Sequence, residues 1–174
     1  YSIREIELLG PECEITFHVS STRLNTSPQS VLDRDTNTVW RSCNCSDSAW
    51  FEMILPSPRD FGAVRLEWGD LYPRAWRLKT MSDGDSEWRT VREESGACGG
   101  VSVITGLAGA CCSIRIEMKA SSNGKGYSLR EVELLSWQEY AAASRLDRVR
   151  GLAGWEGEPR RAVTGRDGSF AVAG

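Results

Sequence analysis

Residues 50–55 read Trp-Phe-Glu-Met-Ile-Leu, a nearly continuous apolar run that is closed by Pro56 and Pro58. A short apolar run bounded by chain-breaking residues is typical of a strand that is buried on both faces. Upstream, Ile15, Phe17 and Val19 alternate with polar residues, which predicts a strand with one buried face. This part of the chain therefore predicts the centre of a β-sheet.

Further strand patterns follow towards the C-terminus. They lie at residues 64–68, 76–80, 88–91, 101–104 and 114–118, and residues 82–86 (Ser-Asp-Gly-Asp-Ser) form a turn signal between two of them. Short strands that are separated by turns every ten or so residues indicate a β-sandwich rather than a helical or α/β fold. We therefore predict an all-β jelly-roll sandwich with an extra N-terminal strand and an irregular C-terminal extension.

One sequence of nine residues occurs twice. Residues 1–9 read YSIREIELL and residues 127–135 read YSLREVELL, with seven positions identical at an offset of 126. This offset is about the size of one sandwich domain. We therefore predict that residues 1–10 are the last strand of a preceding repeat and that 11–137 form one domain. Residues 138–174 are then a linker with a short helix and the start of a further β domain. A chain cut one strand early is the favoured origin of residues 1–9, and donation of the strand to another copy stays as the alternative.

The bulk composition excludes some partners. A net charge of −3 gives no electrostatic case for nucleic acid or an anionic membrane. No apolar run approaches the roughly 18 residues of a membrane span. Residues 23–27 and 42–46 offer only Leu24 as an exposed apolar spike, so we also expect no membrane insertion.

The cysteines and two sequons indicate the compartment. The six cysteines are an even number, which favours three disulfides. Some of the thiols lie close together in the sequence, which leaves zinc as an alternative. Zinc suits these spacings poorly, and His18, the only histidine, is isolated. The sequons at Asn25 and Asn44 fit a secretory route. We therefore predict a secreted or cell-surface glycoprotein in which disulfides involve Cys13, Cys43, Cys45, Cys98, Cys111 and Cys112.

In order and spacing, several motifs resemble the discoidin domains, which include the coagulation-factor C-type domains and the family 32 carbohydrate-binding modules. The matching segments are Ser20-Ser21, 31–42 (VLDRDTNTVWRS), 50–55, 64–69 (VRLEWG), 72–79 (YPRAWRLK), 82–84, Trp88, 113–116 and 127–134. The resemblance implies a jelly-roll sandwich that binds its ligand with the loops at one end.

Asp33, Asp35 and Thr38 place three oxygen ligands within six residues, which suits a hard cation. An EF-hand is excluded because Thr38 replaces the glycine of position six and Asn44 the glutamate of position twelve. The resemblance implies that this loop holds a structural calcium. At the position of Arg34 the family often has glycine instead. The alternative is that the two aspartates only cap a turn. Carried over by position, the calcium ligands are the carbonyl of Ser30, Asp33, Asp35, Thr38, the carbonyl of Arg130 and Glu131.

Catalysis has little support in the sequence. His18 lies in a predicted strand, so no Ser-His-Asp or Cys-His arrangement is available. The cysteines lack a C-x-x-C redox spacing, and nothing singles out one catalytic pair among the 24 acidic residues. We therefore predict that the chain is not an enzyme.

Two binding functions are predicted. The first is one unit of a multidomain extracellular glycoprotein or filament that contacts other domains or copies of itself, as the repeat and the sequons suggest. The alternative is a calcium-stabilised lectin-like module that binds glycans on loops 22–29, 43–48, 70–75 and 122–126. Its ligand residues are expected to be Tyr72, Arg74 and Asn44, with Arg23 and Lys125 behind them. We expect core positions for Trp40, Trp50, Trp68, Trp76 and Trp88.

Overall fold

The computed structural model describes residues 14–44, 47–107 and 109–152, with the backbone alone for 146–152. The predictions for residues 1–13, including the repeated strand and Cys13, lie outside the described residues. So do those for Cys45 and for the β domain expected at the C-terminus. The chain divides into two compact units, residues 1–140 and residues 141–174.

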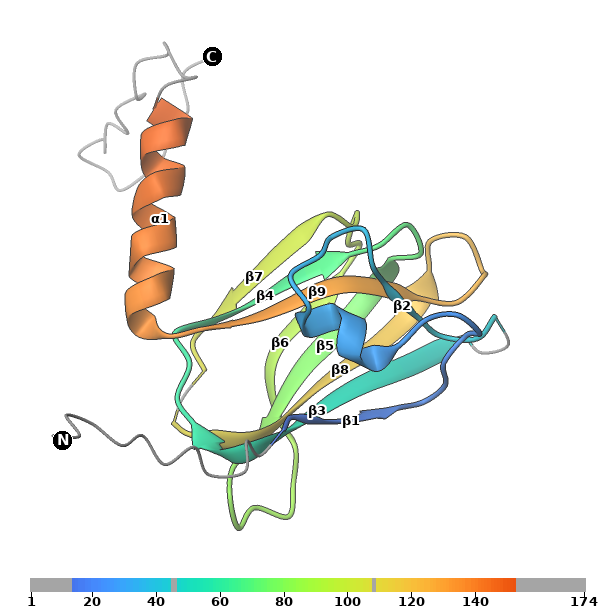
Figure 1. Cartoon of the computed structure of the whole chain (residues 1–174), viewed down its shortest axis with the longest axis horizontal. Helices are drawn as coiled ribbons and strands as arrows, with labels where there is room; N and C mark the ends of the chain where they lie inside the picture. The colour runs from blue at the N-terminus through green and yellow to red at the C-terminus, as the bar shows by residue number, and fades with distance from the viewer. Residues whose placement is uncertain (1–13, 45–46, 108, 153–174) are drawn as a thin grey trace, which may run out of the picture. The chain divides into compact units, whose positions relative to one another are not determined.

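Two antiparallel sheets form the first unit (Figure 1). One has the order β1 (Thr16–Val19), β3 (Ser48–Arg59), β8 (Cys111–Ser121), β5 (Pro73–Met81) and β6 (Arg89–Ser95). The other has the order β2 (Trp40–Arg41), β9 (Ser128–Leu135), β4 (Ala63–Trp68) and β7 (Val101–Thr105). A 3-10 helix, η1 (Pro28–Leu32), precedes β2. The predicted all-β sandwich is confirmed.

The core lies between the sheets and is built around aromatic contacts. Phe51 of β3 packs edge-on against Trp40 at 5.0 Å between ring centroids. Trp68 of β4 and Trp76 of β5 lie 5.7 Å apart, which joins the two sheets. All four side chains are buried, and each contributes about 2–3 kcal/mol through burial.

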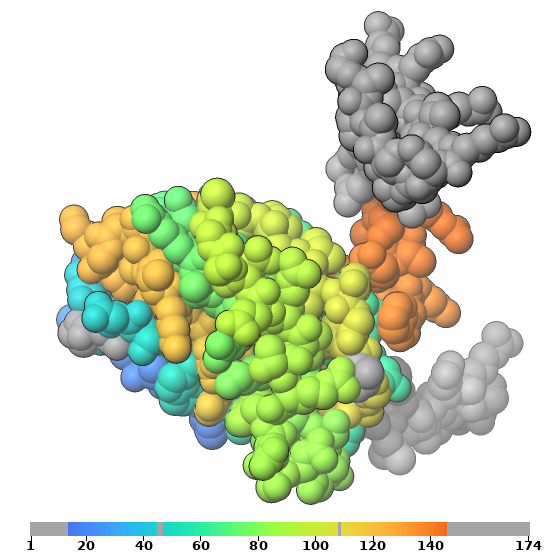
Figure 2. All heavy atoms as spheres, turned by 180° about the vertical axis from the view of Figure 1, so that it is seen from behind, coloured from blue at the N-terminus to red at the C-terminus, as the bar shows by residue number. Residues whose placement is uncertain are grey.

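The expected core positions of Trp50 and Trp88 are wrong. Trp50 follows buried Ala49 and precedes buried Phe51, so strand alternation turns it to the outer face of the sheet. There the Arg115 guanidinium lies 4.6 Å from the Trp50 ring centroid and 4.8 Å from that of Trp88. Both rings are half-buried by this stack. Figure 2 views the molecule from behind, where β5 and β6 (green) form much of the surface.

Strand β3 is longer than the apolar run from which it was predicted. β3 continues past Pro56 and Pro58 to Arg59, because its pairing with β8 is interrupted between Ile54 and Arg59, where the prolines need donate no bond.

The short helix predicted from residue 138 is confirmed as α1 (Trp137–Leu152). It begins with a capping box, in which the Ser136 hydroxyl accepts a bond from the Glu139 amide at 3.2 Å and the Glu139 carboxylate accepts one from the Ser136 amide at 2.8 Å. No helix in the described part of the chain is long and apolar enough to cross a membrane.

Candidate functional site: the loop face and an acidic loop

Four loops meet at one end of the sandwich, on the right of Figure 1. The amide of Arg23 donates to the carbonyl of Arg41 at 2.8 Å, and the Tyr127 amide donates to the Ser42 hydroxyl at 2.9 Å. The amide of Ser122 donates to the Tyr72 carbonyl at 3.0 Å. Hydrogen bonds donated by backbone amides therefore hold the loops together. We call this surface the loop face; its described residues are 20–27, 41–44, 47, 69–74 and 121–127.

The structure brings the predicted ligand residues to this one face. Arg23, Asn44 and Lys125 are exposed at its loops. Arg74 is also exposed, and its Nη2 donates to the carbonyl of Ser122 at 3.3 Å. Tyr72 is half-buried. Its ring rests on the backbone of Gly99, where a Cβ atom would come within 2.7 Å of a ring carbon. The ring also packs against the hydrophobic core, so packing sets its position.

Residues 33–38, which follow η1 and are called the acidic loop below, are organised around Asp33. One carboxylate oxygen accepts a bond from the Asp35 amide at 2.8 Å, and the other accepts one from the Thr38 hydroxyl at 2.9 Å. Thr38 Oγ1 also lies 3.3 Å from the carbonyl of Ser30 and 3.0 Å from that of Asp35. Arg34 has a φ of 61°, in the left-handed region that favours glycine. The loop therefore keeps a conformation for which glycine is the natural choice.

Glu131 of β9 is distant in sequence but lies next to this loop and completes the group. It is 3% exposed, and its Oε1 is buried without a hydrogen-bond partner among the described residues. Burial, with the negative charge of Asp33 beside it, raises the pKa of Glu131 to about 7. The hydrogen bond from the Asp35 backbone lowers the pKa of Asp33. Two neighbouring acids, one of them desolvated, form a site that a cation would stabilise.

The donor set fits calcium. No three His, Cys, Asp or Glu side chains within residues 14–44, 47–107 and 109–152 gather as a metal site. Calcium, however, also takes carbonyl and hydroxyl oxygens. The carbonyls of Ser30 and Asp35, the Thr38 hydroxyl and the carboxylates of Asp33 and Glu131 supply such a mixed set.

Two of the predicted ligands are arranged differently from the others. The Asp35 carboxylate accepts bonds from the backbone amide and the side-chain amide of Asn37, at 2.9 and 2.7 Å. The group of Asp35 that faces Thr38 is the backbone carbonyl and not the carboxylate. The side chain of Arg130 points to Asp70, to which its Nη2 donates at 3.0 Å. For Arg130, the prediction concerns only the backbone carbonyl, and it stays a prediction.

The cysteines do not form the expected set of three disulfides. Cys43 is disulfide-bonded. Cys98, Cys111 and Cys112 are free, which differs from the prediction for these three. Cys111 and Cys112 are neighbours on β8 and point to opposite faces of the sheet, so they are not placed to bond to each other. Cys111 is buried, whereas Cys112 Sγ lies 3.2 Å from the carbonyl of Met81.

Both sequon asparagines are exposed on the loop face, and Asn25 has a φ of 64°. Their glycosylation stays a prediction. Sequence reasoning did not find Arg41 and Asp70, which also lie there and contact each other at 4.0 Å. Arg41 belongs to the discoidin-like segment 31–42, but no local pattern shows that it meets Asp70, because their contact depends on the pairing of distant strands.

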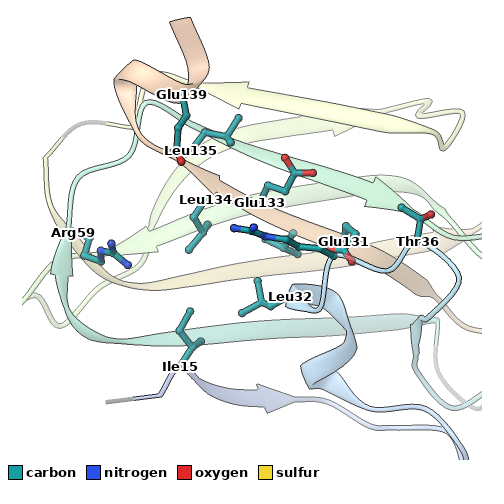
Figure 3. A pocket seen from close by; sticks show the side chains of 11 residues that line it. Ile15, Leu32, Thr36, Arg59, Glu131, Glu133, Leu134, Leu135 and Glu139 are labelled. Carbon is teal, nitrogen blue, oxygen red and sulfur yellow. The ribbon is translucent and has the colours of Figure 1, made fainter. Parts of the chain in front are cut away.

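A pocket of about 530 Å³ on the flank was also not predicted (Figure 3). Its apolar lining includes Ile15, Leu32 and Leu134, and Glu131 lies at one side. β2 pairs only with Ser128 and Leu129, so the later part of β9 faces this pocket. The flank pocket contains none of the five predicted ligand residues of the loop face.

Comparisons with known proteins agree with this architecture. The F5/8 type C domain model matches residues 16–132. No match to the chain was found among curated protein sequences. The second chitosan-binding module of a chitosanase/glucanase from Paenibacillus sp. IK-5, solved with chitotriose, is 25% identical with a TM-score of 0.65, covering 70% of this chain and 95% of that chain.

Two other solved structures are similar in fold. The family 32 carbohydrate-binding module of NanJ from Clostridium perfringens, in complex with galactose, is 16% identical with a TM-score of 0.61 and covers 69% of this chain and 92% of that one. A GH29 fucosidase of Ruminococcus gnavus is 16% identical with a TM-score of 0.62, but the match covers 70% of this chain and only 25% of the fucosidase. The fold thus occurs both as a separate module and as part of an enzyme. This chain belongs to the F5/8 type C domain family, a family of binding modules.

Proposed function

We propose that this chain is a non-catalytic glycan-binding module whose ligand lies on the loop face. The observation that carries the proposal is the convergence of four loops that are tied together by backbone bonds around Tyr72 and Arg74. A supported aromatic ring beside a guanidinium is the combination that stacks on a sugar and bonds to its hydroxyls. The Paenibacillus and NanJ modules, which were solved with chitotriose and galactose, support the same class of ligand.

The comparisons favour this glycan-binding alternative over the protein-contact function that we placed first on the sequence alone. The three similar structures named above are two carbohydrate-binding modules and a fucosidase solved with fucose. The repeat that suggested assembly falls partly in residues 1–13, outside the described residues. Secretion is part of the proposal, supported by the two sequons and by the disulfide at Cys43.

We include a structural calcium in the proposal. Ser30, Asp33, Asp35, Thr38 and Glu131 would hold it with the oxygens described above, and the Arg130 carbonyl is the further predicted ligand. The bound ion would supply positive charge to two adjacent carboxylates. Glu131 belongs to β9, whereas the rest of the described set lies in η1 and the loop that follows it. These residues would therefore tie that segment to the last strand.

A glycan array tests the proposed function. The chain should be produced without N-glycans, so that Asn25 and Asn44 leave the loop face uncovered, and applied with calcium. We expect binding to at least one class of glycan. The variant Tyr72→Ala with Arg74→Ala should lose that signal by about tenfold. Arg77→Ala is the matched control, because Arg77 pairs with Glu93 between β5 and β6, away from the loop face.

The outcome that would overturn the proposed function is an array on which the folded chain binds nothing above background. Equal binding by the control and by the Tyr72 and Arg74 variant would instead remove the loop face as the site. Circular dichroism of all three proteins excludes unfolding as the cause of a lost signal.

A further inference from the structure

A second, more polar pocket borders the loop face. It has a volume of about 300 Å³ and lies between the acidic loop and the turn after β4. Asp70, in its wall, is two residues from Tyr72. The lining residues are Thr36, Asn37, Val39, Arg41, Gly69, Asp70 and Arg130.

Two guanidinium groups in this pocket share one carboxylate. Arg130 Nη2 donates to Asp70 Oδ1 at 3.0 Å, whereas Arg41 Nη2 lies 4.0 Å from Asp70 Oδ2. The Nε of Arg41 is buried and has no hydrogen-bond partner among the described groups. Two positive charges therefore face one carboxylate, and the Nε–H of Arg41 is left without an acceptor among the described groups.

The two arginines are held by the sheet. Arg41 belongs to β2 and pairs with Ser128 of β9, two residues before Arg130. Gly69 lies so close to this strand that a Cβ atom there would come within 2.3 Å of the Ser128 hydroxyl. The positions from which both guanidinium groups extend are thus fixed, while the Asp70 side chain is 71% exposed and can move aside.

The loop face as a whole, like the two arginines, carries an excess of positive charge. The chain as a whole has a net charge of −3. Its loop face nevertheless carries more basic than acidic residues: Arg23, Arg41, Arg74 and Lys125 against Asp47 and Asp70. Asp33, Asp35 and Glu131 lie on the other side of the pocket, so the excess of positive charge belongs to the loop face alone. On that face it favours an anionic ligand over a cationic one.

We propose that Arg41 and Arg130 bind an acidic group, a carboxylate or a sulfate, of the glycan on the loop face. The ligand is then an acidic polysaccharide. The inference rests on the proposed function and adds the substrate class. Guanidinium groups present paired N–H donors that match the two oxygens of such an anion, and the anion displaces Asp70. For the same reason polycationic chitosan is a poor ligand of this chain, although its fold resembles that of a chitosan-binding module.

Affinity electrophoresis and calorimetry with paired polysaccharides test the inference. Polygalacturonate is compared with its methyl ester, which lacks only the charge, and chondroitin sulfate with chondroitin, which lacks only the sulfate. Neutral galactan and chitosan complete the set. The variants are Arg41→Gln, Arg130→Gln and Asp70→Asn, and Arg77→Gln serves as the control for the loss of one exposed arginine.

We expect polygalacturonate or chondroitin sulfate to bind about tenfold more tightly than its uncharged or less charged partner. Each arginine variant should weaken that binding about tenfold. Asp70→Asn should strengthen it, because the competing carboxylate is removed, and a merely structural ion pair would not give this result. A preference for chondroitin sulfate over chondroitin identifies sulfate, and a preference for polygalacturonate over its ester identifies carboxylate.

The inference is overturned if acidic and neutral polysaccharides bind equally, or if folded Arg41→Gln and Arg130→Gln bind as the wild type does. Binding to neutral galactan or chitosan alone overturns the acidic ligand but leaves the proposed glycan-binding function standing. Binding to no polysaccharide overturns both.

Discussion

The hydroxyl of Thr38 donates a hydrogen bond of 2.9 Å to a carboxylate oxygen of Asp33. The same hydroxyl lies within 3.3 Å of the Ser30 carbonyl, so three oxygens of different chemistry converge on one point. With Glu131 nearby, this arrangement is the basis of the proposed calcium site.

Calcium is expected to raise the melting temperature of the chain by several degrees relative to a sample with chelator, because a ligand of the native state stabilises it. Thr38→Val should remove most of this increase, since it deletes one ligand and keeps the side-chain shape. Thr36→Val, at an exposed position in the same loop, is the control. Differential scanning fluorimetry measures all three, and an identical melting temperature with calcium and with chelator would count against the site.

Without calcium, stability should fall as the pH rises. The folded pKa of Glu131 is about 7, above its ordinary value of 4.5, so the native state favours the protonated form. Its contribution is complete below pH 4.5 and is lost as the pH rises through 7. Urea unfolding with chelator at pH 5 and pH 8 should show a loss of about 2 kcal/mol from this group. Glu131→Gln should not show this part of the loss, and a wild-type pH profile identical to that of the variant would contradict the assignment.

Replacing Arg115 should destabilise the domain although it lies on the outer face of a sheet. Its Nε and Nη2 donate to Glu52 at 3.0 and 2.6 Å, and Glu52 is only 7% exposed. Arg115→Met leaves this carboxylate unpaired and breaks two cation–π contacts, at a cost of about 3 kcal/mol in the free energy of unfolding. Adding Glu52→Met should recover part of the loss. Arg77→Met, at an exposed pair, should cost less than about 1 kcal/mol. Chemical denaturation decides, and equal costs at the two arginines would contradict the role of the stack.

The thiols should differ in reactivity. Cys98 is exposed, whereas burial raises the pKa of Cys111 to about 11. We therefore expect maleimide to label Cys98 in the native protein at pH 8 and to label Cys111 only after unfolding. Peptide mass mapping identifies the labelled residues. Unlabelled Cys98, joined instead to another cysteine, would restore the disulfide that the sequence suggested.

Much of the fold was predictable because strand alternation depends on local sequence. The pattern of Ile15, Phe17 and Val19 predicted β1, and the turn signal at residues 82–86 fell between β5 and β6. Trp50 and Trp88 were placed wrongly, because hydrophobicity alone does not show that the guanidinium of Arg115 on β8 lies against both rings.

The candidate site was predictable only in part, for the same reason. Asp33 and Thr38 lie close in sequence, and the resemblance to discoidin domains supplied Glu131. Arg41, Asp70 and Arg130 come from three separate segments, and their contact follows from sheet order, which no local pattern encodes. At Arg34 the sequence showed only that the family often has glycine, and the structure adds that the backbone there is left-handed.

Amide chemical-shift mapping by NMR tests the central claim most directly. The calcium-loaded chain is titrated with trigalacturonic acid and, separately, with chitotriose. Glycan binding on the loop face predicts that at least one of the two sugars shifts the amides of residues 41–44, 69–74 and 121–130. The acidic-ligand inference predicts that trigalacturonic acid does so at lower concentration than chitotriose. Shifts confined to the flank pocket around Ile15 and Leu134, or no shift with either sugar at millimolar concentration, would contradict the account.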